Sequence, residues 1–240
     1  MSWRTKPCLL ALRDFGRTIG ANRLIASLAW KEYEDRFGKL MLGSIRQGDV
    51  VWDVGANVGL YSRKFSDIVG PAGRVIAYEP SPANLQRLKE AVGSRLNVTV
   101  LPIALGQSEA AVFIEQGSDP LGATSRIVSN DKAMPGREGA AEVRLSSGDL
   151  LVSSGTIDTP NVIKIDTEGF ELNVLLGLKR TLLQRHLRAV CVEVHFGLLS
   201  EQGLHRAPQQ IEELLASSGF SVTWPDASHI VATRKNECGE

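Results

Sequence analysis

The sequence has few cysteines, no excess charge of either sign and no long apolar run. Its three cysteines, Cys8, Cys191 and Cys238, are far apart and odd in number, which argues against a disulfide framework and against a zinc site with paired ligands. Lysine plus arginine and aspartate plus glutamate number 27 each, so no strong field favours nucleic acid or an anionic membrane as a partner. No stretch approaches the roughly 18 apolar residues that span a bilayer. We therefore expect neither a membrane nor a nucleic-acid partner.

The amino-terminal region also lacks a convincing secretory signal. The apolar run 8–12 is short, and Arg13 and Asp14 follow it directly. A cytoplasmic location is the default expectation, and we interpret Cys191 as a small buried hydrophobe with no chemistry of its own. With 240 residues and 43% hydrophobic content, the chain is predicted to form a helical extension over residues 1–47 and one domain over residues 48–240.

Short apolar runs alternate with helical patterns throughout the second part. Strands are predicted over 50–54, 74–78, 97–101, 161–166 and 189–194, and helices over 60–69, 82–92, 170 to about 183, and 208–218. A closing pair of strands, 220–224 and 229–233, suits an antiparallel hairpin at the sheet edge. This alternation predicts an α/β fold in which helices cover both faces of a parallel sheet.

One region departs from this alternation. Short strands over 111–115 and 142–145 flank a polar, glycine-rich segment, residues 117–139, that has little periodicity. A loop of this length in a compact domain is usually functional or disordered. We favour a mobile cover over an active site.

A strand-to-helix turn with two glycines carries the first chemical signal. The turn reads Asp53-Val54-Gly55-Ala56-Asn57-Val58-Gly59. Its glycines stand where the backbone must turn sharply and approach a ligand closely. Glu79 ends the next strand, where a carboxylate can accept both hydroxyls of a ribose. The candidate cofactor-binding residues are Asp53, Gly55, Asn57, Gly59, Glu79, Pro80 and Ala104.

The choice of cofactor depends on Asp53. In a nicotinamide-binding fold a pyrophosphate lies against the glycine turn, and the Asp53 carboxylate would repel it. S-adenosylmethionine carries an ammonium and a sulfonium instead, and Asp53 is suited to hold the ammonium directly or through water. Ile103 and Ala104 are placed to line the adenine, although core packing explains them equally well.

Charged residues at a second strand end carry the other signal. The segment 161–171 delivers Lys164, Asp166 and Glu168 to the same edge of the sheet as the cofactor. Both carboxylates could instead cap the following helix, whose amino-terminus favours negative charge. Glu171, already inside that helix, is more ambiguous still.

These motifs, in this order, resemble the FkbM-type methyltransferase family. The matching segments are 53–59, 78–82, 164–171 and 193–195, and the resemblance covers roughly residues 48–200. It implies a three-layer, Rossmann-like class I methyltransferase sheet of about seven strands, the last one antiparallel. It also implies S-adenosylmethionine as cofactor and transfer to a hydroxyl oxygen of a sugar or natural-product molecule. Thr167 and Phe170 depart mildly from the family pattern. These departures leave the cofactor prediction unchanged and the identity of the methyl acceptor open.

Methyl transfer requires an aligned acceptor oxygen and removal of its proton. For the base we nominate Asp166 first and His195 second, because the ordinary pKa of histidine suits proton acceptance near neutrality. Glu193 lies two residues before His195 and shares its face of the strand, so it is predicted to orient the imidazole and to contact substrate. Lys164 is predicted to pair with Asp166 and keep it ionised, or to bind an acidic substrate group. Alternatively, His195 has only a structural role, as a hydrogen-bonded histidine at the end of a strand.

The catalytic set is therefore Asp166, His195, Lys164 and Glu168. We assign no metal ligand, and a divalent cation held by Asp166, Glu168 and His195 stays as the less favoured alternative. From the resemblance and from loop position, Ser125 and Arg126 are the candidate substrate-binding residues.

Two other functions compete with this one. An NAD-dependent oxidoreductase shares the fold and Glu79, and a non-catalytic binding module could retain the fold alone. The partner is expected to be a small-molecule acceptor whose identity the sequence leaves open. Formation of a homo-oligomer is open as well.

Overall fold

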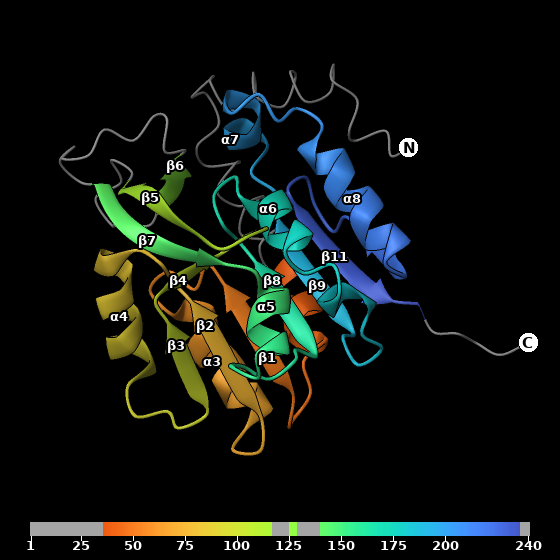
Figure 1. The fold of residues 1–240 in the computed structure, drawn as a ribbon. Coiled ribbons are helices and arrows are strands. Elements are labelled where there is room, and N and C mark those ends of the chain that lie inside the picture. Colours follow the sequence, from red (N-terminus) through yellow and green to blue (C-terminus); the bar gives the residue numbers. More distant parts are fainter. Residues whose placement is uncertain (1–35, 117–124, 129–139, 236–240) are drawn as a thin grey trace, which may run out of the picture.

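The structure is a computed structural model that describes residues 36–116, 125–128 and 140–235 (Figure 1). Its main element is a seven-stranded sheet in the order β10-β11-β9-β8-β1-β2-β3. The strands are β1 (Val50–Val54), β2 (Arg74–Tyr78), β3 (Val98–Leu101), β8 (Val162–Ile165), β9 (Ala189–Glu193), β10 (Phe220–Thr223) and β11 (His229–Arg234). Strand β11 runs in the direction opposite to the other six strands of this sheet. The predicted three-layer α/β fold is confirmed, and the closing hairpin places β10 at the edge.

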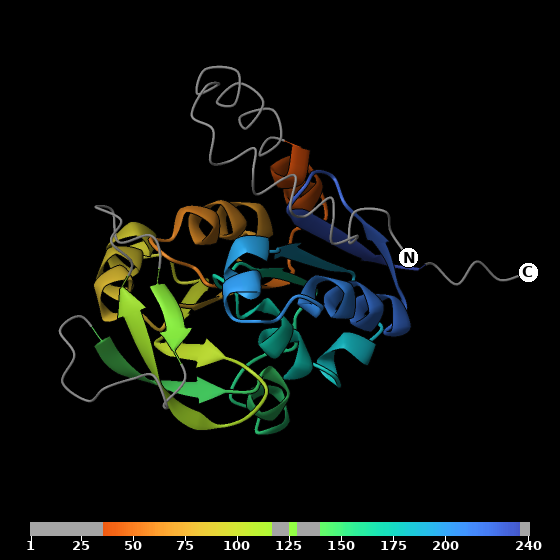
Figure 2. The same cartoon turned by 90° about the horizontal axis from the view of Figure 1, so that it is seen from above.

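Helices cover both faces of the sheet (Figure 2). They are α3 (Leu60–Val69), α4 (Pro82–Val92), α5 (Gly148–Ser153), α6 (Glu171–Leu176), α7 (Phe196–Glu201) and α8 (Ala207–Ser217). Residues 36–43 are also helical, and they lie with α3 and α4 on one side, opposite α5, α6 and α8 (Figure 2).

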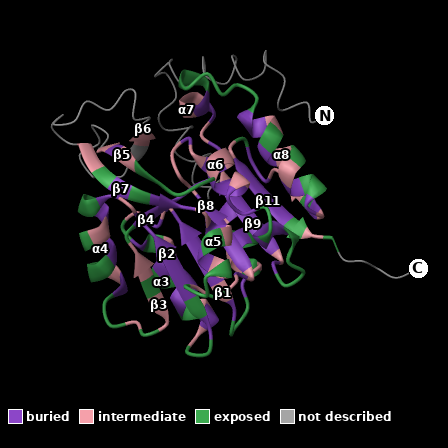
Figure 3. Ribbon diagram, viewed as in Figure 1, coloured by how far each residue is buried: buried purple, intermediate pink, exposed green. Residues whose placement is uncertain are grey.

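Alternation along the strands divides the core between these two faces. Val51 packs toward residues 36–45 and α3, whereas Trp52 packs toward α5 and α6. Because successive strand residues point to opposite faces, a strand covered on both sides needs an unbroken apolar run. Strands β1, β2, β8, β9 and β11 are accordingly buried along most of their length (Figure 3), whereas the edge strands β3 and β10 are only partly buried. Cys191 is among these buried residues, and burial raises the pKa of its thiol to about 12.

The described part of the predicted extension contributes to this core. Phe37, Met41 and Ile45 are buried against Val51 and Phe65. Residues 1–35, which make up the rest of the extension, lie outside the described part of the chain. Among the helices that the structure describes, none has the length and apolar character needed to cross a membrane.

A second, four-stranded sheet lies beside the first, in the order β4-β7-β5-β6. Its strands are β4 (Ile103–Leu105), β5 (Ala110–Gln116), β6 (Ser125–Val128) and β7 (Ala140–Ser146). The expectation of an irregular segment over 117–139 was wrong for β6, which pairs antiparallel with β5. Four residues carry too little periodicity to be recognised, and β6 gains its hydrogen bonds from a partner strand. The remainder of the expected cover, 117–124 and 129–139, falls outside the described residues.

The helix predicted from Phe170 to about Leu183 was also wrong in its length. Helix α6 ends at Leu176, and only a 3₁₀ turn, Thr181–Leu183, follows. The Asp149 carboxylate accepts hydrogen bonds from the backbone N–H groups of Arg180 and Thr181, both at 2.8 Å. A side chain distant in the sequence therefore satisfies N–H groups that a continuing helix would have bonded internally.

Gly177, directly after α6, allows the end of this helix to approach the second sheet closely. A Cβ atom at this position would lie 1.9 Å from the carbonyl oxygen of Gly106, which follows β4. We expect Gly177→Ala to lower the free energy of unfolding by at least about 2 kcal/mol, because backbone must move to admit the methyl group. Urea unfolding followed by circular dichroism measures this.

Gly197→Ala is the matched control, since nothing lies within 4 Å of a Cβ atom there. Its stability should stay equal or rise by up to about 1 kcal/mol, because alanine restricts the unfolded chain and suits a helix. Equal stability of the two variants would contradict the close approach at Gly177.

Candidate active site

The glycine turn after β1 lies directly against the end of β8. Gly55 and Gly59 have positive φ angles of 76° and 84°, and Asn57 between them has φ 51°. A Cβ atom on Gly55 would come within 1.8 Å of the Asp166 carbonyl oxygen. Glycine at position 55 is therefore required both by the left-handed backbone and by the neighbouring strand. The turn brings the first sequence motif into contact with the second.

Glu79, at the end of the adjacent strand β2, stabilises this turn through hydrogen bonds. Its Oε2 accepts a hydrogen bond of 2.7 Å from the Asn57 backbone N–H, and its Oε1 accepts one of 2.8 Å from the Ser81 N–H. The side chain is buried. Burial raises the pKa of Glu79 to about 7, although the two backbone donors and the charge of Lys164 act in the opposite direction. The carboxylate changes charge near neutrality.

Asp53 and Lys164 form a buried ion pair between β1 and β8. The two residues are direct neighbours in the strand register, and Lys164 Nζ lies 3.1 Å from Asp53 Oδ1. Lys164 also donates to the Gly55 carbonyl oxygen at 2.8 Å and lies 3.4 Å from Asp166 Oδ2. Burial disfavours the ammonium, but Asp53 and Asp166 raise the pKa of Lys164 above its ordinary value. The predicted pairing with Asp166 is present, and Asp53 is the nearer partner.

The Asp53 carboxylate points toward Lys164 and does not line the pocket that opens beside the glycine turn. Its side chain is completely buried, and its Oδ2 accepts a hydrogen bond of 2.6 Å from the Ser62 hydroxyl. The pocket is lined instead by the following residues, Val54, Gly55 and Asn57. The geometry thus gives Asp53 a place behind the turn, where it orders Lys164 and α3.

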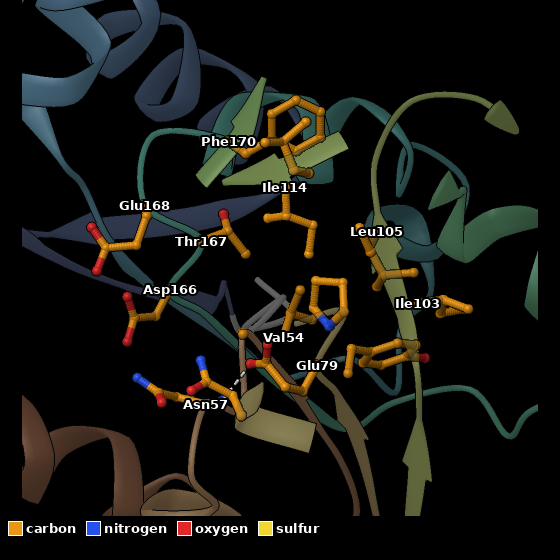
Figure 4. A pocket seen from close by; sticks show the side chains of 16 residues that line it. Val54, Asn57, Glu79, Ile103, Leu105, Ile114, Asp166, Thr167, Glu168 and Phe170 are labelled. Carbon is orange, nitrogen blue, oxygen red and sulfur yellow. Dashed lines mark hydrogen bonds between the residues drawn. The ribbon is translucent and has the colours of Figure 1, made fainter. Parts of the chain in front are cut away.

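A pocket opens where the ends of β1, β2 and β8 meet β4 and β5. The space inside it is continuous with solvent, and its cavity volume is about 70 Å³. Figure 4 shows Asp166 and Glu168 on one side, Ile103 and Leu105 on the opposite side, and Glu79 between them. The pocket therefore has one charged wall and one apolar wall.

Three polar atoms at this pocket are buried without a hydrogen-bond partner in the described part of the chain. They are Tyr78 Oη, Asn84 Oδ1 and Thr167 Oγ1, and all three residues line the pocket. A buried polar group without a partner costs about 1–3 kcal/mol. Such groups around one cavity favour a ligand that is itself polar and satisfies them.

His195 stands at the charged side of the pocket among four carboxylates. Its Nδ1 lies 2.8 Å from Glu171 Oε1, whereas its Nε2 lies 3.4 Å from Glu168, 3.7 Å from Asp166 and 3.8 Å from Glu193. Burial disfavours the imidazolium, but Glu171, Glu168 and Asp166 outweigh it and raise the pKa of His195 to about 9. The nomination of His195 as a base assumed an ordinary histidine pKa. That assumption was wrong.

The prediction that Glu193 orients the His195 imidazole was also wrong. Glu171 holds the imidazole at Nδ1, and Glu193 does not approach as closely. Glu193 lies between two histidines, with its Oε2 3.5 Å from His229 Nε2. His229 in turn bonds Asp226 through Nδ1 at 2.8 Å. At the start of α6 the backbone N–H of Gly169 donates to Glu171 Oε1 at 2.8 Å, and within the described residues no hydrogen bond joins the Asp166 or Glu168 side chain to this helix end.

Comparison with known proteins decides the family. A model of the methyltransferase FkbM domain matches residues 53–222. The chain belongs to the FkbM methyltransferase family. Its predicted resemblance to that family is thereby confirmed.

Two curated relatives of this FkbM methyltransferase are informative. The hexuronic acid methyltransferase AglP of Haloferax volcanii is 31% identical over 83% of this chain and 76% of its own length. The 31-O-demethyl-FK506 methyltransferase FkbM of Streptomyces tacrolimicus is 26% identical over 74% of this chain and 75% of its own length.

One solved structure shares the fold at low identity. The methyltransferase FkbM of Methylobacillus flagellatus KT superposes with a TM-score of 0.51 and 17% identity, covering 77% of this chain. The chain spans only 43% of that protein. The likeness supports the architecture of the FkbM domain and nothing more specific.

The structure brings together most of the residues that were predicted from the sequence of this FkbM methyltransferase. Those that line the pocket are Gly55, Asn57, Glu79, Pro80, Ala104, Asp166 and Glu168. Gly59 lies behind it, at the start of α3, packed against Leu88. Ser125 and Arg126 lie in β6, opposite Gln116 and Glu115, and their side chains are outside what the structure describes.

Several site residues had no usable signal in the sequence. Asn84 is one polar residue among many in α4, and His229 and Asp226 come from a hairpin far along the chain. Glu171 was noticed but left ambiguous, because a glutamate in the first turn of a helix is common. Its complete burial is what sets it apart.

The buried ion pair of this FkbM methyltransferase yields a stability prediction. We expect Lys164→Met to destabilise the fold by about 3–5 kcal/mol, because Asp53 is left buried without its cation. Urea unfolding at neutral pH measures this. The double variant Asp53→Asn with Lys164→Met removes both charges and should recover part of the loss. A double variant that is less stable than Lys164→Met would contradict the pairing.

Proposed function

We propose that this protein transfers a methyl group from S-adenosylmethionine to a hydroxyl oxygen of a sugar or a natural-product small molecule. The observation that carries the proposal is the pocket in which Glu79, the glycine turn and Asp166 meet. Glu79, which is suited to accept the hydroxyls of a ribose, and Asp166, which is suited to receive a proton, line the same cavity. Family membership adds that the group transferred is methyl.

The residues present fit this cofactor. Both Glu79 oxygens are used by backbone donors, yet a carboxylate has about four lone-pair positions, so it can still accept the ribose hydroxyls. Ile103 and Leu105 offer an apolar wall suited to adenine, and the buried Asn84 Oδ1 is a candidate partner for a polar group on that ring. The turn at Gly55 and Asn57 would contact the aminoacid part. S-adenosylmethionine, when bound, supplies a methyl group activated by a positively charged sulfur.

On the acceptor side, Asp166 is the proposed proton acceptor. It lines the pocket at the end of β8, and its side chain is 29% exposed, so that a substrate hydroxyl can reach it. Lys164, fixed by Asp53 and the Gly55 carbonyl, holds the carboxylate in place from behind. Transfer then depends chiefly on alignment of the acceptor oxygen with the methyl carbon.

The name of the Streptomyces relative supports oxygen as the acceptor atom, and the name of the Haloferax relative supports a sugar acid as the acceptor molecule. One is named for a hexuronic acid and the other for a 31-O-demethyl compound. We extend this to a hydroxyl acceptor for the present chain. The oxidoreductase alternative lacks support, because none of the three tyrosines, Tyr33, Tyr61 and Tyr78, is followed by a lysine four residues later.

Incubation of the purified chain with methyl-labelled S-adenosylmethionine tests the function. The acceptor panel would hold hexuronic acid glycosides, macrolides and small phenols, and NMR would locate the new methyl group. We expect an O-methyl product and S-adenosylhomocysteine in equal amounts. Binding of NAD in place of S-adenosylmethionine, seen by calorimetry, would refute the proposal.

Asp166→Asn tests the acceptor side. We expect kcat to fall by at least about 100-fold, because the amide cannot accept the hydroxyl proton, while the Kd for the cofactor changes little. Asp158→Asn, a substitution of an exposed carboxylate paired with Arg74, is the control and should leave both constants unchanged. An Asp166→Asn enzyme with full turnover would exclude Asp166 from the transfer step.

Cofactor affinity should also depend on pH through Glu79. Its pKa of about 7 in the free protein means that the charged carboxylate, the better acceptor for ribose hydroxyls, predominates only above that pH. We expect the Kd to decrease by up to about tenfold between pH 6 and pH 8. Glu79→Gln should bind more weakly and lose this dependence, as calorimetry would show. A variant that retains the same pH dependence would assign it to another group.

A further inference from the structure

The charged wall of the pocket has the composition and spacing of a cation site. One ligand atom each from Asp166, Glu168 and His195 lies within 4.8 Å of the other two. The distances from His195 Nε2 to Glu168 and Asp166, 3.4 Å and 3.7 Å, are longer than those of good hydrogen bonds. Ligands of a small divalent cation, bonded at about 2.0–2.2 Å, lie about 3 Å apart when adjacent. The two distances from His195 Nε2 exceed this spacing by about 0.4 Å and 0.7 Å.

The surroundings of this cluster supply a second, independent observation. Glu171 is completely buried beside the cluster, and its Oε2 has no hydrogen-bond partner in the described residues. Its Oε1 holds His195 at Nδ1, which turns Nε2 toward Asp166 and Glu168. A carboxylate behind the imidazole is the usual support of a metal-ligating histidine.

The negative charge around this cluster also favours a bound cation. Four carboxylates, those of Asp166, Glu168, Glu171 and Glu193, lie within 3.8 Å of the His195 ring nitrogens. The nearby Lys164 is already shared with Asp53 and the Gly55 carbonyl, so it does not neutralise them all. In the free protein the His195 imidazolium lies among them, and a divalent cation bound at Nε2 would take the place of its proton.

We propose that Asp166, Glu168 and His195 bind a divalent cation of the magnesium and manganese class. Two carboxylates with one imidazole suit manganese in particular, since carboxylate oxygens favour such hard ions and imidazole is accepted alongside them. Asp166 and Glu168 also line the cofactor pocket. The cation would therefore lie at the border between the cofactor and the acceptor.

This inference rests on the proposed transfer to a hydroxyl and specifies how the acceptor is held. The acceptor oxygen would bind the cation, which favours loss of the hydroxyl proton to the Asp166 oxygen that does not bind the ion. The oxygen lone pair then forms the new carbon–oxygen bond as the carbon–sulfur bond breaks, and the electron pair of that bond remains on sulfur. Asp166 acts in this scheme as a ligand of the ion.

Titration of the full chain with Mn²⁺, followed by electron paramagnetic resonance, tests the site without any substrate. We expect one bound ion per chain. Glu168→Gln and His195→Gln should each weaken Mn²⁺ binding by at least about tenfold. Glu90→Gln, at an exposed position paired with Gln86, is the matched control and should bind as the parent chain does. Circular dichroism establishes that each variant is folded.

The outcomes separate this inference from the proposed function. Absence of saturable Mn²⁺ binding at millimolar concentration, or equal binding by Glu168→Gln and the parent chain, overturns the cation site. Methyl transfer that continues at full rate in EDTA overturns it as well and leaves the methyltransferase proposal intact. Site-specific Mn²⁺ binding without methylation of any hydroxyl acceptor supports the site and counts against the proposed transfer.

Discussion

The active site depends on one buried ion pair, that of Asp53 and Lys164. These residues are register neighbours on β1 and β8, and the ammonium also bonds the Gly55 carbonyl. Removing two charges from water is costly, so the pair is retained only where its geometry also satisfies the remaining donors. Here it fixes the glycine turn against the strand that carries Asp166. The glycine turn and the charged wall of the pocket thus share one electrostatic support.

Close backbone approach reinforces this support. Gly55 packs against the Asp166 carbonyl, and Gly177 packs against Gly106 where the second sheet meets α6. Both contacts exclude a side chain, so the distance between the walls of the pocket is set by backbone atoms. Rigid walls suit a reaction in which alignment contributes much of the rate.

The division of the pocket into a charged and an apolar wall follows from topology. Parallel strands end at one edge of a sheet, and their terminal polar residues gather there. The apolar wall comes from β4, the first strand of the second sheet, and so it needs no charged residue of its own. Histidines from the ends of β9 and β11 lie beside the charged wall, on either side of Glu193.

The sequence by itself determined the strand and helix pattern of the main sheet, the glycine turn, Glu79 and the Lys164 to Glu168 segment, because these depend on local periodicity and on motif spacing. Tertiary structure decided the rest. The early end of α6 depends on Asp149, and β6 exists through its pairing with β5. The charge state of His195 depends on Glu171, and Asp53 turned out to support Lys164 and not to line the pocket. Each of these arises from burial or from contact between residues distant along the chain, which no local pattern encodes.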